Sequence, residues 1–100
     1  MITQDFELVQ KIFELVEAGI VHGYDAFRYN LEWGGNYMET ELAVEKNGSE
    51  SWDVETDFNV SKVYALVEQL HGNATARGEP WASFVLSYRE GEQVKINFTY

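Results

Sequence analysis

The first apolar positions of the chain recur every three or four residues. This spacing places side chains along one side of a helix, so the pattern predicts an amphipathic helix over residues 3–19. Gly19 or Gly23 would end it, because glycine readily adopts the backbone conformation that closes a helix. The apolar positions of this stripe are Phe6, Val9, Ile12, Phe13, Val16 and Ile20.

From residue 24 onward, apolar and polar side chains alternate, which is typical of strands with one buried face. The alternation predicts strands over 24–33, 38–45 and 52–57. Glycine and asparagine residues within 34–36 and 46–48 separate these segments and favour tight turns. We therefore expect three neighbouring antiparallel strands.

Helical spacing of the apolar residues returns over 60–71, and this segment is predicted to be the second helix. Asn59 and Ser61 are candidate caps for its first turn, because their side chains accept hydrogen bonds from free backbone amides. Residues 72–80 contain two glycines and little apolar content, so we expect a loop there.

The end of the chain alternates again over 82–88 and 94–100, with a glycine turn between the two segments, and predicts a hairpin. The order αβββαββ predicts an α+β fold, in which a mostly antiparallel five-stranded sheet has both helices on one face. A chain of 100 residues is too short to build two hydrophobic cores, so we expect a single domain over residues 1–100.

The composition excludes several classes of function. Seven basic and seventeen acidic side chains give a formal net charge of −10, which repels nucleic-acid phosphates and anionic membrane surfaces. No cysteine is present, which excludes disulfides, thiol nucleophiles and thiolate metal sites. No apolar run follows a basic segment at the N-terminus, and we expect a cytoplasmic protein.

The negative charge is concentrated in the first half of the chain. Residues 1–58 carry thirteen acidic and three basic side chains, whereas residues 59–100 carry four of each. Because side chains alternate across a strand, the carboxylates of the second and third predicted strands should form two rows that lie side by side. These rows are Glu39, Glu41 and Glu45 on one strand, and Asp53, Glu55 and Asp57 on the other.

Two interpretations of this acidic surface are open. It either keeps a small domain soluble and prevents sheet edges from pairing, or it docks a basic partner. Tyr37 and Trp52 lie within or beside the rows, and aromatic side chains ringed by charge are typical interface anchors, although a core position is the simpler interpretation of Trp52. The candidate partner-binding residues are Glu39, Glu41, Glu45, Trp52, Asp53 and Glu55.

No pattern in the sequence is typical of an enzyme. His22 and His71 each lie at the end of a predicted helix, where a positive charge suits the helix dipole. The carboxylates lack the loop spacing of a calcium site, and no phosphate-binding loop, nucleophile elbow or zinc-binding helix motif occurs. We therefore expect no catalytic residue, no cofactor and no metal ion.

The last twenty residues read WASFVLSYREGEQVKINFTY. This segment resembles the C-terminal hairpin of the YezG-like immunity proteins of bacterial polymorphic toxin systems. In that family a Trp opens a strand of alternating aromatic residues, a turn with Gly follows, and a Lys-x-x-Phe-x-Tyr strand ends the domain. The matching positions are Trp81, Gly91, Lys95, Phe98 and Tyr100. The central acidic strands match no pattern of the family, so no contact residue is carried over.

The resemblance implies an immunity protein that binds and neutralises a cognate toxin domain of a contact-dependent or secreted system. Such toxins are frequently nucleases, and a nuclease must present a basic cleft to the phosphate backbone, which an acidic protein can occupy.

Three alternatives remain open. One is a nucleic-acid mimic that inhibits another protein. The second is a homo-oligomeric structural module whose last strand, with Val94, Ile96 and Phe98, pairs with a copy of itself. The third is a domain that binds a small molecule or a metal ion.

Overall fold

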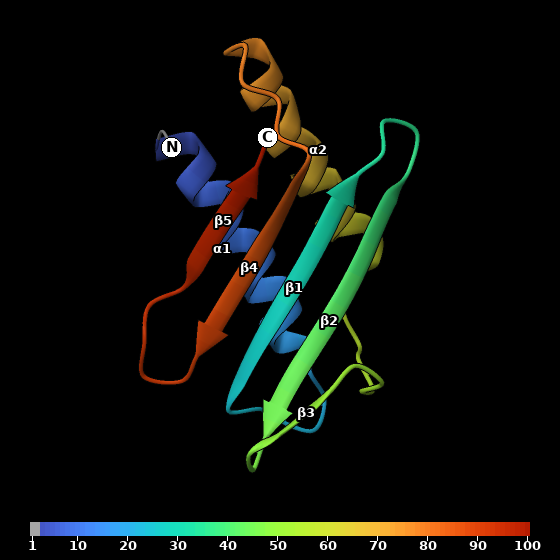
Figure 1. Ribbon diagram of the computed structural model, residues 1–100, viewed down its shortest axis with the longest axis vertical. Helices are drawn as coiled ribbons and strands as arrows, with labels where there is room; N and C mark the ends of the chain where they lie inside the picture. Colours follow the sequence, from blue (N-terminus) through green and yellow to red (C-terminus); the bar gives the residue numbers. More distant parts are fainter. Residues whose placement is uncertain (1–2) are drawn as a thin grey trace.

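Two helices and five strands follow one another in the predicted order αβββαββ (Figure 1). The computed structural model describes the backbone of residues 3–100 and the side chains from residue 5 onward. The helices are α1 (Thr3–Ala18) and α2 (Val60–Ala76). The strands are β1 (Ala26–Trp33), β2 (Met38–Lys46), β3 (Ser49–Ser51), β4 (Ser83–Arg89) and β5 (Lys95–Thr99).

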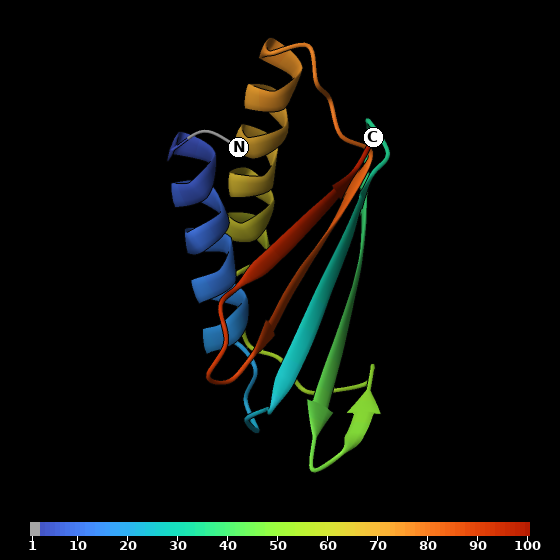
Figure 2. The same ribbon diagram turned by 60° about the vertical axis from the view of Figure 1, so that its left-hand side comes forward.

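The five strands form one antiparallel sheet in the order β3-β2-β1-β4-β5, which places β1 at the centre. Both helices lie on the same side of this sheet and run in opposite directions (Figure 2). The other side, which no helix covers in the described part of the chain, is called the open face below, and Figure 1 looks onto it. The prediction of an α+β fold with both helices on one face is confirmed.

The hydrophobic core lies between the covered side of the sheet and the two helices. On β1, Phe27, Tyr29 and Leu31 are buried, whereas the alternate residues Arg28 and Asn30 belong to the open face. The strand β4 contributes Phe84 and Leu86 to the same core. The helical residues buried in this core are Leu8, Val9, Ile12, Phe13, Val16, Val63, Val67, Leu70 and Ala74.

The second helix is longer than the sequence predicts. It continues to Ala76, so the predicted loop over 72–80 is wrong for its first five residues. The reason is Ala74, which continues the buried stripe of the helix but is too small to stand out in a polar segment. At the other end the prediction is confirmed, because the Asn59 side chain accepts a hydrogen bond of 3.0 Å from the backbone amide of Lys62.

The third strand is also misplaced in the prediction. The turn at Asn47 and Gly48 has positive φ at both residues, as a tight hairpin requires, and β3 follows it at once over Ser49–Ser51. Residues 52–57 leave the sheet and cross to the helix side, where the backbone amide of Asp57 donates to the carbonyl of Gly19 (2.7 Å).

The physical reason for this crossing is a contact that is distant in the sequence. Phe58 packs so closely against Gly19 that any Cβ at Gly19 would clash with it. The same ring lies edge-on to Tyr29 in the core, with ring centroids 6.4 Å apart. Burial of Phe58 therefore draws the preceding segment away from β2, although its residues alternate as a strand would.

A buried carboxylate joins the start of α1 to the end of α2. Asp5 is 2% exposed, forms an ion pair of 2.8 Å with Arg77 and accepts a hydrogen bond of 3.3 Å from the Asn73 side chain. Its position in the first turn also suits the positive end of the helix dipole.

We predict that Asp5→Ala destabilises the protein by about 2 kcal/mol, because Arg77 would lose its partner in a site that is only partly open to water. Urea unfolding measures this loss. The control is Glu7→Ala on the exposed side of the same helix, which should change the free energy of unfolding far less. Equal losses in the two variants would contradict a special role for Asp5.

We also predict that Tyr29 makes the protein sensitive to alkali. Burial raises the pKa of Tyr29 above its ordinary value of 10.0, as does Tyr64 nearby, and a hydrogen bond with Thr40 offsets part of the rise. A raised pKa in the folded state means that stability is complete below the unfolded-state pKa and falls as pH rises above it. Compared with Tyr29→Phe, the wild type should lose up to about 1.4 kcal/mol more per pH unit above pH 10. Urea unfolding of both proteins at several alkaline pH values checks this, and parallel losses would contradict it.

Candidate partner-binding surface

Three of the six candidate residues share the open face of β2. Glu39 and Glu41 are exposed and Glu45 is half-buried, and all three alternate with the core-facing residues of the strand. The register places Glu39 opposite Glu32 of β1 and Glu41 opposite Asn30. The predicted row on this strand is therefore present.

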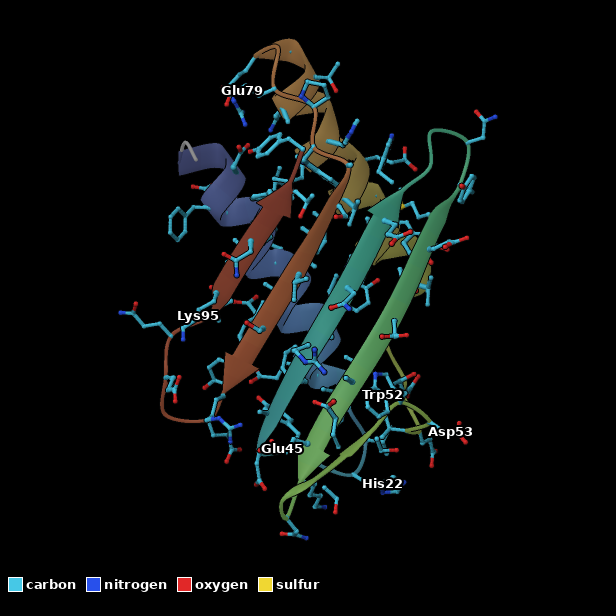
Figure 3. All side chains as sticks on the ribbon, viewed as in Figure 1. His22, Glu45, Trp52, Asp53, Glu79 and Lys95 are labelled. Atoms are coloured by element: carbon cyan, nitrogen blue, oxygen red, sulfur yellow. The ribbon has the colours of Figure 1, made fainter. Side chains whose placement is uncertain are left out.

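The other three candidates, Trp52, Asp53 and Glu55, follow β3 on the segment that leaves the sheet. Figure 3 shows Trp52 and Asp53 beyond the outer edge of β2, near its C-terminal half. The prediction of two parallel acidic rows is wrong, because this segment crosses to α2 instead of pairing with β2. Across the short β2–β3 ladder, the facing carboxylates are Glu45 and Glu50.

The carboxylates of Glu45 and Glu50 are neutralised by two arginines, Arg89 and Arg28, that are not among the residues predicted from the sequence to form the site. Arg89 of β4 pairs with Glu45, and Arg28 of β1 pairs with Glu50, each at 2.8 Å. The hydrogen bond and the negative charge of Glu45 raise the pKa of Arg89. These four side chains line an open hollow of about 210 Å³. Strand alternation places Arg28 on the polar side, but its partner depends on the sheet register.

The other half of the open face keeps its negative charge. Glu32 and Glu39 face each other directly across β1 and β2, and Glu41 is two residues further along the same face. Among the side chains that the structure describes, none forms an ion pair with these three carboxylates. These three residues, Glu32, Glu39 and Glu41, are called the acidic corner below. Facing like charges destabilise a sheet, so the acidic corner lowers the free energy of unfolding, and no ion pair among the described side chains offsets this loss.

Two exposed aromatic side chains flank the outer edge of β2. Tyr37 is 61% exposed just before the strand, and Trp52 is 55% exposed just after β3. The Tyr37 ring lies against Gly34, where a Cβ would clash with it, so the turn fixes the position of this ring. Trp52 does not belong to the core, contrary to the simpler interpretation of the sequence.

Asp53 and Glu55 lie at the rim of a second hollow, of about 340 Å³, near the C-terminal end of β2. His22 pairs with Glu55 at 2.9 Å, and the Lys46 ammonium donates to the His22 carbonyl. The apolar side chains in this hollow are Ile20, Val44 and Val54. Lys46 also lines this hollow and Glu55 is paired with His22, so Asp53 is the one carboxylate there without an ion pair among the described side chains.

The outer edge of β2 presents free backbone groups. The Gly34 amide donates to the Tyr37 carbonyl (2.9 Å), which fixes the alternation of backbone directions along the hairpin. The N–H and C=O groups of Met38, Thr40 and Leu42 consequently point away from β1. β3 pairs only with residues 44–46, so within residues 3–100 no strand covers this edge from 38 to 43.

The remaining candidate features have structural roles. His71 stacks on Trp33 with ring centroids 4.0 Å apart, and its Nε2 bonds to the carbonyl of Trp81 (3.0 Å). Val94, Ile96 and Phe98 belong to the strand that the homo-oligomer alternative pairs with a second copy of the chain. Their side chains pack against the core.

The described residues contain no group of three His, Asp or Glu side chains placed to hold a metal ion. In the same part of the chain, neither helix is long and apolar enough to cross a membrane.

No protein-family model matches this chain, and no curated protein matches it significantly. The resemblance of the C-terminal hairpin to YezG-like immunity proteins therefore stays a prediction.

The backbone directions along β2 predict a pattern of amide hydrogen exchange. The amides of Met38, Thr40 and Leu42 should exchange about tenfold faster, or more, than those of Glu39 and Glu41, because only the latter donate to β1. Exchange followed by NMR on the free protein measures this difference. Equal protection of both sets would contradict an open edge.

Proposed function

We propose that this chain is an immunity-type inhibitor that binds and neutralises the basic domain of a bacterial toxin, with a nuclease as the expected toxin class. The observation that carries the proposal is the acidic corner of Glu32, Glu39 and Glu41, which lies between two exposed aromatic residues and has no ion-pair partner among the described side chains. A basic partner would provide the missing positive charge.

Electrostatics supports this choice of partner. The net charge of −10 attracts a basic protein over distances of about 10 Å, the Debye length near 0.1 M salt. Steering of this kind raises association rates to as much as about 10⁸–10⁹ M⁻¹s⁻¹ at low salt, and these rates fall steeply as salt is added. A nuclease domain carries positive charge where it holds phosphates, and carboxylates can occupy that region in place of the substrate.

The exposed aromatic residues would slow dissociation of the complex, to which exposed charges contribute little. Exposed carboxylates contribute mainly to encounter and specificity, whereas slow dissociation depends on a few large side chains that become buried in the interface. Tyr37 and Trp52 are the two exposed aromatics beside the acidic residues, and Tyr37 is held in place by its contact with Gly34.

The six candidate residues differ in how much each is expected to contribute to binding. Glu39, Glu41 and Asp53 are exposed and without an ion pair in the described side chains, whereas Glu45 is already paired with Arg89. We expect the unpaired group to contribute more to binding than Glu45, because a partner gains nothing from a carboxylate that an arginine already neutralises.

The proposal is tested first by capture of the tagged protein's partner from lysate of its own cells, at low and high salt, with mass spectrometry. The expected partner is a basic toxin domain whose activity the protein inhibits and whose retention weakens with salt. Capture of no such domain, from cells shown to express a toxin, would contradict the proposal.

Charge reversal then tests the site. The triple variant Glu39→Lys, Glu41→Lys and Asp53→Lys should weaken toxin binding by about tenfold or more, because it turns attraction into repulsion at the interface. Titration calorimetry and inhibition of the toxin measure the loss.

The matched control reverses three exposed carboxylates away from this surface, with Glu7→Lys and Glu14→Lys on α1 and Glu79→Lys in the loop after α2. Both variants change the net charge equally, so long-range attraction falls by a similar amount in each. Similar affinities of the two folded variants would exclude β2 and its neighbouring segment as the binding site.

A further inference from the structure

We propose that the toxin partner adds an extended segment to the outer edge of β2 as an extra antiparallel or parallel strand, and that this segment carries Lys or Arg at alternate positions. The inference rests on the proposed function and specifies how the partner binds. Its basis is the juxtaposition of an unpaired backbone edge with the carboxylates of Glu39 and Glu41.

The outer edge of β2 has free backbone groups that can pair with a further strand. Met38, Thr40 and Leu42 each direct one N–H and one C=O away from β1, and β3 ends before it reaches them. An exposed row of this kind is a template for pairing with another chain. The open stretch runs from the turn before Met38 to the end of β3, and residues 38–43 span about 20 Å when extended.

The open face determines the side chains that such a segment needs. A strand added beside β2 would place its own open-face residues opposite Glu39 and Glu41, with Cβ atoms about 5 Å apart. The two carboxylates are two residues, or about 7 Å, apart along the strand, which matches the spacing of alternate residues in the added strand. Lys or Arg at those positions would neutralise the charge that β1 and β2 leave unpaired.

The other side of the added strand meets a different surface. Its alternate residues would lie beside Thr40 and Leu42, and Leu42 packs partly against the core. Apolar or small side chains suit that side. A segment that alternates basic and apolar residues therefore fits, and Tyr37 and Trp52 would contact it near its ends.

A second copy of this chain fits the same edge poorly. Antiparallel pairing of two copies centred on Thr40 would place Glu39 of one copy directly opposite Glu41 of the other, and such like-charged pairs destabilise a sheet. Carboxylates on an edge strand thus prevent self-association while leaving the edge open to a basic segment. The opposite edge, β5, differs because its open-face residues Lys95, Asn97 and Thr99 include a cation and no carboxylate.

The test uses a synthetic peptide as the probe, acetyl-GKVKVKG-amide, with acetyl-GKKKVVG-amide as a control of the same composition without alternation. Isotope-labelled protein is mixed with either peptide at millimolar concentration, and amide exchange and NMR shifts are recorded. We expect the alternating peptide to protect the amides of Met38, Thr40 and Leu42 from exchange, with no protection on β5. The control peptide should protect neither edge.

A pair of variants separates strand pairing from simple attraction of charges. Thr40→Pro removes an N–H that points away from β1, so the hairpin keeps its own hydrogen bonds. It should weaken binding of the alternating peptide by about tenfold, because a carbonyl of the peptide loses its donor. Thr40→Val keeps the N–H and replaces the hydroxyl, which forms a hydrogen bond with Tyr29, by a methyl group. This variant should bind the peptide as the wild type does. The amide spectra show whether both variants are folded.

Equal binding by folded Thr40→Pro and Thr40→Val would overturn strand pairing, as would equal effects of the two peptides or protection confined to β5. These results would leave the proposed function standing, because toxin inhibition and its loss on charge reversal are measured separately. Failure of the proposed function has a different signature, namely that no basic toxin domain is inhibited. Loss of toxin inhibition in Thr40→Pro but not in Thr40→Val would support the inference on the complete partner.

Discussion

Burial of one side of β1 against both helices is the interaction on which the rest of the structure depends. β1 lies at the centre of the sheet, and Phe27, Tyr29 and Leu31 are almost completely buried there. A register slip of one residue would exchange the two faces of a strand, so burial of these side chains fixes every neighbouring pairing. The acidic corner is a consequence, because the register that buries Leu31 also brings Glu32 opposite Glu39.

Local patterns in the sequence predict most of the fold, since the helices and four of the five strands follow from spacing alone. The errors arise where a distant contact decides the path. Residues 52–57 alternate like a strand, yet Phe58 packs on Gly19 and draws them away from β2. Ala74 likewise extends α2 because the core accepts it, although its segment looks like a loop.

The same limit applies to the candidate surface. Alternation correctly assigns Glu39, Glu41 and Glu45 to one face, but the pairing of Glu45 with Arg89 depends on two strands that lie far apart in the sequence. Charge patterning therefore identifies an acidic region, and only the sheet register shows which part of it remains unneutralised. The open face is thus divided into a half with internal ion pairs and a half whose like charges oppose folding.

The segment over residues 52–57 has a consequence for how this protein can change over evolutionary time. Its two ends are fastened by backbone contacts, through the β2–β3 ladder on one side and the Asp57 amide on the other. Between these ends, Trp52, Asp53 and Glu55 are exposed, and Val54 alone packs against the core. Substitutions at these three positions would break no core contact and only one surface pair, that of Glu55 with His22, so the segment is free to change its recognition properties while the rest of the sequence stays constant.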